Sequence, residues 1–165
     1  FQEAMALGSM ENYFDLAQNH ITQGTEGADN SLSCMAMILN ALGHDPKHTW
    51  KGMWRWNTPE VLQREDPNAE STKVDVVDFA AKARCKGANA NAFPCSSLEE
   101  IAGLEQFRSE LKAACENAAS SSHVVVHFDR AAIGLAGHGH FSPVGGYHAE
   151  KDMVLILDVA RKASP

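Results

Sequence analysis

The sequence predicts an α+β fold, with helices first and an antiparallel sheet after them. Apolar residues recur at helical spacing in several stretches before residue 120, whereas the strongest strand pattern, "HVVVHFD", begins at His123. The later stretch "GHFSPVGGYHAEKDMVLILDVA" is typical of a β-hairpin. With 165 residues the chain can bury one core, so we expect a single domain over 1–165, in which 1–12 could form a flexible extension.

The central element of this prediction is a buried helix over about residues 32–42. Asn30 or Ser31 is a good N-cap for it, and Gly43 is suited to end it. Apolar side chains cover nearly its whole circumference, which indicates a helix surrounded by other elements. Before it, the sequence predicts a helical segment within "MENYFDLAQNHITQ" and a Gly-rich loop over 24–30.

A tryptophan-rich loop is predicted after the central helix, over residues 44–67, and its stretch "WKGMWRW" holds all three tryptophans. Such loops usually close the edge of a core, here with Lys51 and Arg55 stacked on the rings; a stacking or membrane-interface role is the alternative. The rest of the helical half is predicted as a helix over 71–87 that ends at Gly87, a short strand over 88–93, and one or two helices over 97–118 that begin with a capping box of Ser97 and Glu100.

The sheet half is predicted from three strand patterns. "HVVVHFD" predicts the first strand, over 123–129. The hairpin then supplies a strand from about His140, a turn near residues 150–152, and a strand from Val154 to Val159. If the hairpin forms, His140 and Asp158 lie on neighbouring strands.

Charge and composition exclude several classes of partner. The net charge is −7 and no basic block is present, which argues against nonspecific binding to nucleic acid. No apolar run approaches the ~20 residues that a membrane span needs. The four cysteines lack a CxxC spacing, so we expect free thiols in a reducing intracellular compartment, and an organellar location is compatible with this.

His140 and Asp158 form the most suggestive pair of polar residues. An Asp inside "VLILDVA" is costly to bury as a charge unless another group pairs with it. A neighbouring His ring would satisfy it, and that pair is the base and orienter of a nucleophilic triad. The alternatives are a structural hydrogen bond between the two, or an Asp that caps a strand end at the surface.

Two further groups of residues allow a chemical interpretation. Cys34 lies near the start of the central helix, where it could be an activated nucleophile or a small buried hydrophobe. Paired histidines on strand faces could bind zinc, but their spacing is not that of a structural zinc site, and we predict no metal. These histidines are His123, His127, His138, His140 and His148.

Two long motifs resemble those of phytochelatin synthases. "LNALGHDPKHTWKGMWRW" is similar to the family's LNAL-x-x-DP-x-x-x-WKG-x-WRW, and "GHFSPVGGYHAEKDMVLILDVAR" to its GHFSP-x-GGY-x-x-x-x-D-x-x-LI-x-DVAR. "FDLAQNHITQ" resembles the lead-in F-x-L-x-x-x-F-x-x-Q. The resemblance spans about Tyr13 to Arg161, nearly the whole chain.

The resemblance implies a papain-like fold, in which a helical N-terminal half surrounds a central helix and an antiparallel sheet forms the other half. It implies a γ-glutamylcysteine dipeptidyl transpeptidase that acts on glutathione. In this family a Cys at the head of the central helix takes the γ-Glu-Cys acyl group and releases glycine, and a second glutathione or a longer chain accepts the group. Heavy-metal thiolates of glutathione, those of cadmium or zinc, promote the reaction, and no cofactor is implied.

Individual site residues carry over by their place in the motifs. His140 of "GHFSP" is implied as the base and Asp158 of "LDVAR" as its orienter. Gln23 of "ITQ" matches the oxyanion-hole glutamine. The positions implied to contact substrate are Arg130, ten residues before the base, and Arg161.

The nucleophile does not carry over. In the family the Cys precedes the Asn of "LNAL" by ten residues, and here that position is Asn30. Bringing Cys34 into register would need a deletion inside the buried helix, which would rotate its apolar face. In the ungapped register Cys34 lies one turn inside the helix, about 6 Å from Asn30 along the axis.

Two flanking stretches also depart from the family. Leu135 and Ala136 replace a Gln-Thr pair, and "KASP" follows Arg161 where the family has "FKYPP". Ending there would leave the domain short at its C-terminus, and a shortened sheet would be expected to pack against a partner protein.

The sequence therefore favours a pseudoenzyme of the family, retained as a structural or interaction subunit of a larger assembly. One alternative is an active transpeptidase or glutathione hydrolase that uses Cys34 or a water activated by His140. The other is a non-catalytic module that binds glutathione or its metal thiolates.

Overall fold

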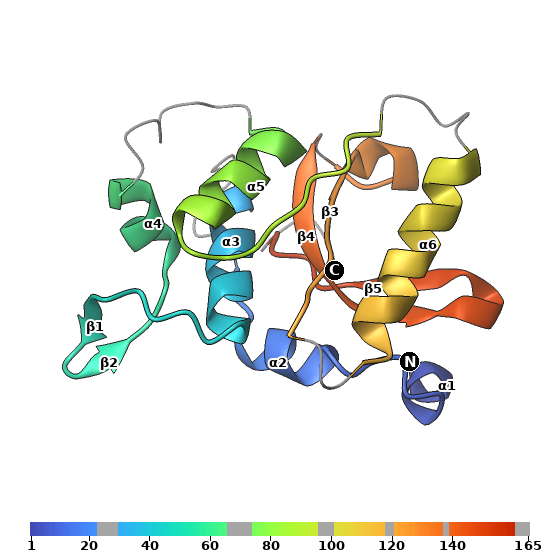
Figure 1. Cartoon of the computed structure of the whole chain (residues 1–165), viewed down its shortest axis with the longest axis horizontal. Coiled ribbons are helices and arrows are strands. Elements are labelled where there is room, and N and C mark those ends of the chain that lie inside the picture. Colours follow the sequence, from blue (N-terminus) through green and yellow to red (C-terminus); the bar gives the residue numbers. More distant parts are fainter. Residues whose placement is uncertain (23–29, 66–73, 96–100, 118–120, 137–138, 161–165) are drawn as a thin grey trace.

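The computed structural model describes residues 1–22, 30–65, 74–95, 101–117, 121–136 and 139–160. It confirms the predicted α+β class: helices gather around a small antiparallel sheet (Figure 1). The helices are α1 (Gln2–Ala6), α2 (Tyr13–Gln18), α3 (Asn30–Ala41), α4 (Pro59–Glu65), α5 (Val76–Cys85) and α6 (Ile101–Cys115). The strands are β1 (Thr49–Lys51), β2 (Trp54–Arg55), β3 (Val125–Phe128), β4 (His140–His148) and β5 (Met153–Ile156), with short 3-10 turns at Arg130–Ile133 and Ala149–Lys151.

Helix α3 is buried, as its apolar circumference predicts. Cys34 and Met37 are 0% exposed and lie in two different apolar clusters. The cluster around Cys34 includes Phe79 of α5 and Phe141 of β4, whereas the cluster around Met37 includes Leu16 of α2. Because both clusters pack against it, α3 is fixed along its length with its first turn beside β4.

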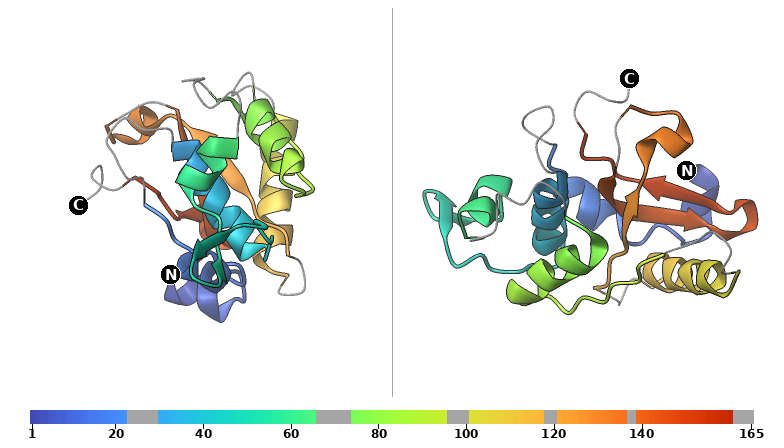
Figure 2. Two further views of the ribbon diagram at one scale, coloured as in Figure 1. Left: turned by 90° about the vertical axis from the view of Figure 1, so that its left-hand side faces the viewer. Right: turned by 90° about the horizontal axis from the view of Figure 1, so that it is seen from above.

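The sheet has the order β3-β4-β5, with both pairs antiparallel. All nine residues of the central strand β4 are buried, and α6 lies along one face of the sheet (Figure 2). The N-terminal segment also packs closely against β4, because a Cβ on Gly146 would lie 2.8 Å from the Met10 side chain. A side chain at position 146 would therefore force the Met10 side chain to shift where the N-terminal segment crosses β4.

The N-terminal segment 1–12 holds α1 and is attached to the sheet. Ser9, Met10 and Asn12 are buried. The Asn12 amide donates to the carbonyl of Ala114 at 2.6 Å, and the carbonyl of Ser9 accepts from the N–H of Tyr147 at 3.2 Å. The extent of the domain beyond these contacts stays a prediction.

Two local predictions are wrong. Residues 44–67 were expected to be a loop, but they contain the β1-β2 hairpin and α4. Thr58 caps α4 through its hydroxyl, which accepts from the N–H of Val61 at 3.3 Å, and Pro59 takes the first helical position, where it loses no hydrogen bond. The strand expected over 88–93 does not form: in the described part of the chain no strand pairs with these residues, and Ala88 and Ala90 pack against the core.

At Trp54 the tryptophan-rich segment does not close the core as expected. Met53 is 94% exposed and Trp54 is 76% exposed at the tip of the β1-β2 hairpin, which projects from the body (Figure 1). Arg55 pairs with Asp45.

Other helix boundaries follow local signals. Helix α3 begins at Asn30 itself, two residues before the predicted start, and α5 begins after a capping box of Asp75 and Asp78. Gly87 follows α5 with a φ of 94°, as its predicted role at the helix end requires. The predicted capping box of Ser97 and Glu100 lies outside the described residues.

Candidate active site at the head of helix α3

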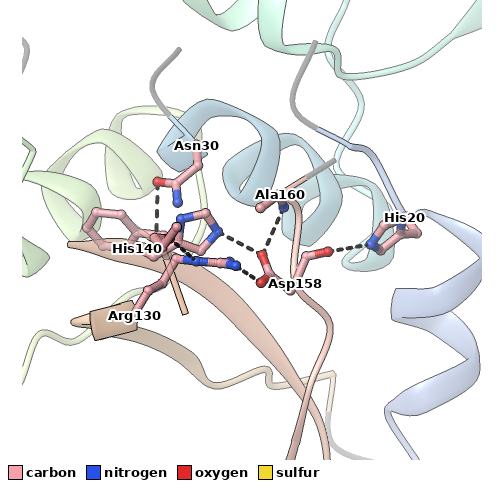
Figure 3. Close-up of polar contacts among 8 residues, drawn as sticks. His20, Asn30, Arg130, His140, Asp158 and Ala160 are labelled. Carbon is pink, nitrogen blue, oxygen red and sulfur yellow. Dashed lines mark hydrogen bonds and ion pairs between the residues drawn. The ribbon is translucent and has the colours of Figure 1, made fainter. Parts of the chain in front are cut away.

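His140 and Asp158, the pair singled out in the sequence, lie in contact. The Nε2 atom of His140 is 2.8 Å from Oδ1 of Asp158 (Figure 3). His140 is the first residue of β4, while Asp158 lies just after β5 rather than within it, since the strand ends at Ile156. The N–H of Leu157 still donates to the carbonyl of Pro143 at 2.9 Å, which keeps this part of the chain beside β4.

Arg130 completes the polar group on the other side of the carboxylate. Its Nη1 pairs with Oδ2 of Asp158, and its Nε donates to the carbonyl of Ala136 at 2.9 Å. The side chain is 2% exposed. It lies in the 3-10 turn after β3, which Asp129 caps by accepting from the N–H of Ala131 at 3.0 Å.

The environment shifts the pKa values of the pair. Burial is the largest influence on His140 and lowers its pKa below the ordinary 6.5, although Asp158 acts in the opposite direction. Burial alone would raise the pKa of Asp158, but the N–H of Ala160 and the neighbouring His140 and Arg130 hold it below 3.8. A neutral imidazole beside an ionised carboxylate is the protonation state of a general base with its orienting group.

Asn30 stands at the head of α3, opposite the start of β4. Its Oδ1 accepts a hydrogen bond from the N–H of Phe141 at 3.4 Å, and the residue is 7% exposed. Figure 3 shows its carboxamide pointing toward the His140 ring, which lies between Asn30 and Asp158. A group at the position of the Asn30 side chain would therefore face the ring side that Asp158 does not occupy.

Cys34 lies elsewhere. Its side chain is 0% exposed in the cluster with Phe79 and Phe141, and burial alone raises the pKa of its thiol far above the ordinary 9.0. A thiol that cannot ionise is a poor nucleophile. Its burial fits the interpretation of Cys34 as a small hydrophobe.

Some predicted site residues lie outside the described part of the chain. These are Gln23, Arg161 and, among the histidines, His138. Among the residues that the structure describes, no three His, Cys, Asp or Glu side chains converge on a point that could hold a metal ion. In that same part of the chain, no helix is both long and apolar enough to cross a bilayer.

Two contacts at the site were not predicted from the sequence, although His127 was considered there as a possible zinc ligand. The Nε2 atom of His20 lies 3.0 Å from the backbone carbonyl of Asp158, which ties the segment after α2 to the end of the sheet. His127 of β3 stacks on Phe141 with ring centroids 4.2 Å apart. A lone exposed His carries no pattern of its own, so only the strand register, which sets His127 opposite Phe141, could have indicated the second contact.

Comparison with known proteins gives a consistent result. A family model described as Phytochelatin synthase matches residues 1–164. "Glutathione gamma-glutamylcysteinyltransferase 3" of Lotus japonicus is 40% identical over 168 residues, which cover 100% of this chain and 33% of the relative. The corresponding protein 1 of Arabidopsis thaliana is 38% identical with 33% covered, and that of Schizosaccharomyces pombe is 36% identical with 39% covered. The chain thus spans about a third of the length of these curated relatives.

Proposed function

The chain belongs to the phytochelatin synthase family, and from this premise we propose that it carries a form of the family's transferase site that lacks the nucleophile. In this proposal the fold is papain-like, His140 and Asp158 hold the positions of base and orienter, and Asn30 holds the position of the nucleophile. The chain is then a pseudoenzyme that keeps the site's framework without its acyl-transfer step.

The observation that carries the proposal is the position of Asn30. It is the first residue of a buried helix, it contacts the strand that begins with His140, and its carboxamide points toward the imidazole. A nucleophile at that place could pass its proton to His140. The nitrogen lone pair of a carboxamide is delocalised into its carbonyl, so Asn30 cannot form the acyl-enzyme that a thiolate would form.

The alternative of a working enzyme that uses Cys34 has less support. Cys34 is fully buried among apolar side chains, and its pKa is raised by that burial. To attack a substrate it would have to leave the core cluster that holds α3 against α5. Attack by a water activated at His140 would bypass both residues and would release glycine from the unchanged chain.

The test is restoration of the thiol. We expect the chain to release glycine from glutathione no faster than the protein-free background in the presence of cadmium or zinc, whereas Asn30→Cys should release it at least about 100-fold faster than that background. Adding His140→Ala to Asn30→Cys should abolish the gain, and Asn30→Ser is the matched control for side-chain size. Glycine release by the unchanged chain that is lost in His140→Ala would overturn the proposal.

A second candidate is a module that binds glutathione without transforming it. The intact His140–Asp158 pair at the head of the twelve-residue helix α3 favours it, because the N-terminus of a helix attracts anionic groups. Calorimetry with glutathione should then show saturable binding that Asn30→Asp weakens. No heat up to millimolar glutathione would contradict this candidate.

The predicted role as an interaction subunit draws support from the β1-β2 hairpin. Met53 and Trp54 present large apolar side chains to solvent at its tip, which is typical of a surface that contacts another protein. In a complex formed through this tip, Trp54→Ser should weaken binding at least tenfold and leave the thermal midpoint of the chain unchanged. Equal binding by the variant would remove the hairpin from that role.

A further inference from the structure

We propose that Arg130 is a positioning residue: it holds the Asp158 carboxylate ionised and oriented, so that His140 keeps its proton on Nε2 and leaves Nδ1 available toward Asn30. This inference rests on the site assignment of the proposed function but not on the loss of the nucleophile. It differs from the substrate contact that the family resemblance implies for Arg130.

The first support is the burial of Arg130. Its side chain is 2% exposed, and its guanidinium contacts the Asp158 carboxylate and the carbonyl of Ala136. A buried guanidinium costs several kcal/mol of desolvation unless it is paired and hydrogen-bonded, so these partners fix its place. An arginine that is buried and paired in this way is poorly placed to bind the carboxylate of a substrate.

The second support is the arrangement around Asp158. Its Oδ1 accepts from the N–H of Ala160 at 2.8 Å and faces Nε2 of His140 at 2.8 Å, while Oδ2 is taken by Arg130 (Figure 3). Its backbone carbonyl is held by His20. Since each carboxylate oxygen has a donor, the plane of the carboxylate cannot rotate, and only one oxygen is presented to the imidazole.

The electrostatic consequence concerns the charge of His140. A lone buried carboxylate would attract a second proton onto the imidazole, whereas the guanidinium of Arg130 offsets that attraction. In the described residues the titratable and charged groups facing His140 are Asp158, Arg130 and His127, and the last two both act to lower its pKa. Arg130 therefore helps to keep the imidazole neutral, which a base requires.

The test is the titration of His140 by NMR in the folded chain, which needs no turnover. Arg130→Gln should raise the proton affinity of His140 at least about threefold, and Arg130→Lys, which keeps the charge, should return most of that change. In an Asp158→Asn background, Arg130→Gln should have a smaller effect, because the part of its action that passes through the carboxylate is lost and only the direct effect of its charge on His140 is left. Arg108→Gln is the matched control, since Arg108 pairs with Asp152 on the surface.

An unchanged His140 titration in folded Arg130→Gln would overturn the inference. If that variant does not fold, the unmodified chain decides the question through the nitrogen chemical shifts of His140. The proton should be found on Nε2 with Nδ1 bare, and the opposite tautomer would overturn the inference. Failure of the glycine-release assay would leave these outcomes untouched, so the two proposals fail separately.

Discussion

Helix α3 carries an asparagine at its first residue and another at its last but one, and the two make different bonds. The carboxamide of Asn40 donates to the carbonyl of Asn57 at 3.0 Å and accepts from that residue's N–H at 2.9 Å and from its Nδ2 at 3.1 Å. Among the described residues, the Asn30 side chain instead accepts one hydrogen bond, from the N–H of Phe141 at 3.4 Å.

The difference indicates that Asn40 stabilises the fold, whereas Asn30 lies at the candidate active site. Asn40 belongs to the retained "LNAL" motif, and its bonds hold the chain after the hairpin against the C-terminal end of α3. At the candidate active site, the bond of Asn30 is long. The fold is therefore secured at the C-terminal end of α3, while the head of the helix can change residue with little structural cost.

The sharpest test of this contrast is Asn40→Ala. It removes the partners of the Asn57 N–H and carbonyl at a part-buried site, so we expect a loss of about 3 kcal/mol in the free energy of unfolding. Urea unfolding followed by circular dichroism measures it, with Asn40→Asp as the variant that keeps an acceptor but loses the donor. A loss below about 1 kcal/mol would break the comparison.

Cys34→Ala should have the next largest effect. Removing a sulfur that is 0% exposed leaves a small cavity in the core, so we expect a loss of about 1.5 kcal/mol in the free energy of unfolding.

The burial of Cys34 also predicts that it reacts with iodoacetamide at least tenfold more slowly than the exposed Cys85 in the native state. Equal rates of alkylation, measured by mass spectrometry of peptides, would return Cys34 to the list of candidate nucleophiles.

Much of the fold could be predicted because its signals are local. The apolar circumference of α3 and the strand–turn–strand pattern of the hairpin predict buried elements whatever surrounds them. The β1-β2 hairpin was missed because its tryptophans resemble core residues, whereas Trp54 is exposed. Hydropathy alone cannot distinguish an aromatic residue that closes a core from one that projects from a hairpin.

The site was predictable only in part, for a similar reason. The pairing of His140 with Asp158 follows from hairpin geometry, and the structure brings the two together at 2.8 Å. The bond of Arg130 to Asp158 joins a turn after β3 to the end of the sheet, and the contact of His20 joins the N-terminal half to that same point. Contacts between segments so far apart leave no periodicity in the sequence.

A smaller effect is expected from pH. Burial lowers the pKa of His140 and of His123 below 6.5, so the unfolded chain binds more protons than the folded chain once the pH falls below 6.5. Stability should therefore be complete above pH 6.5 and decrease as the pH falls from there toward the folded pKa values. Asp158, whose pKa is held below 3.8, adds a further loss below pH 4.

The measurement is the free energy of unfolding from pH 7.5 to 5.0. His140→Gln should flatten the slope, because it removes a group that binds protons more readily in the unfolded chain. His44→Gln, at a residue outside the site, is the control. A slope of opposite sign would show that Asp158 prevails over burial and that the imidazole is charged in the folded chain.

Asn30→Ala should have the smallest effect on stability, a loss of about 1 kcal/mol, because the buried Phe141 N–H loses one long hydrogen bond, whereas Asn40→Ala removes three bonds. Paired with Asn40→Ala under identical conditions, it tests the contrast between the two ends of α3 with the same substitution. A loss as large as that of Asn40→Ala would mean that Asn30 was selected as a structural residue that links α3 to β4. A near-neutral result would instead mean that the position tolerates replacement, which is the condition under which a nucleophile can be lost while the surrounding fold persists.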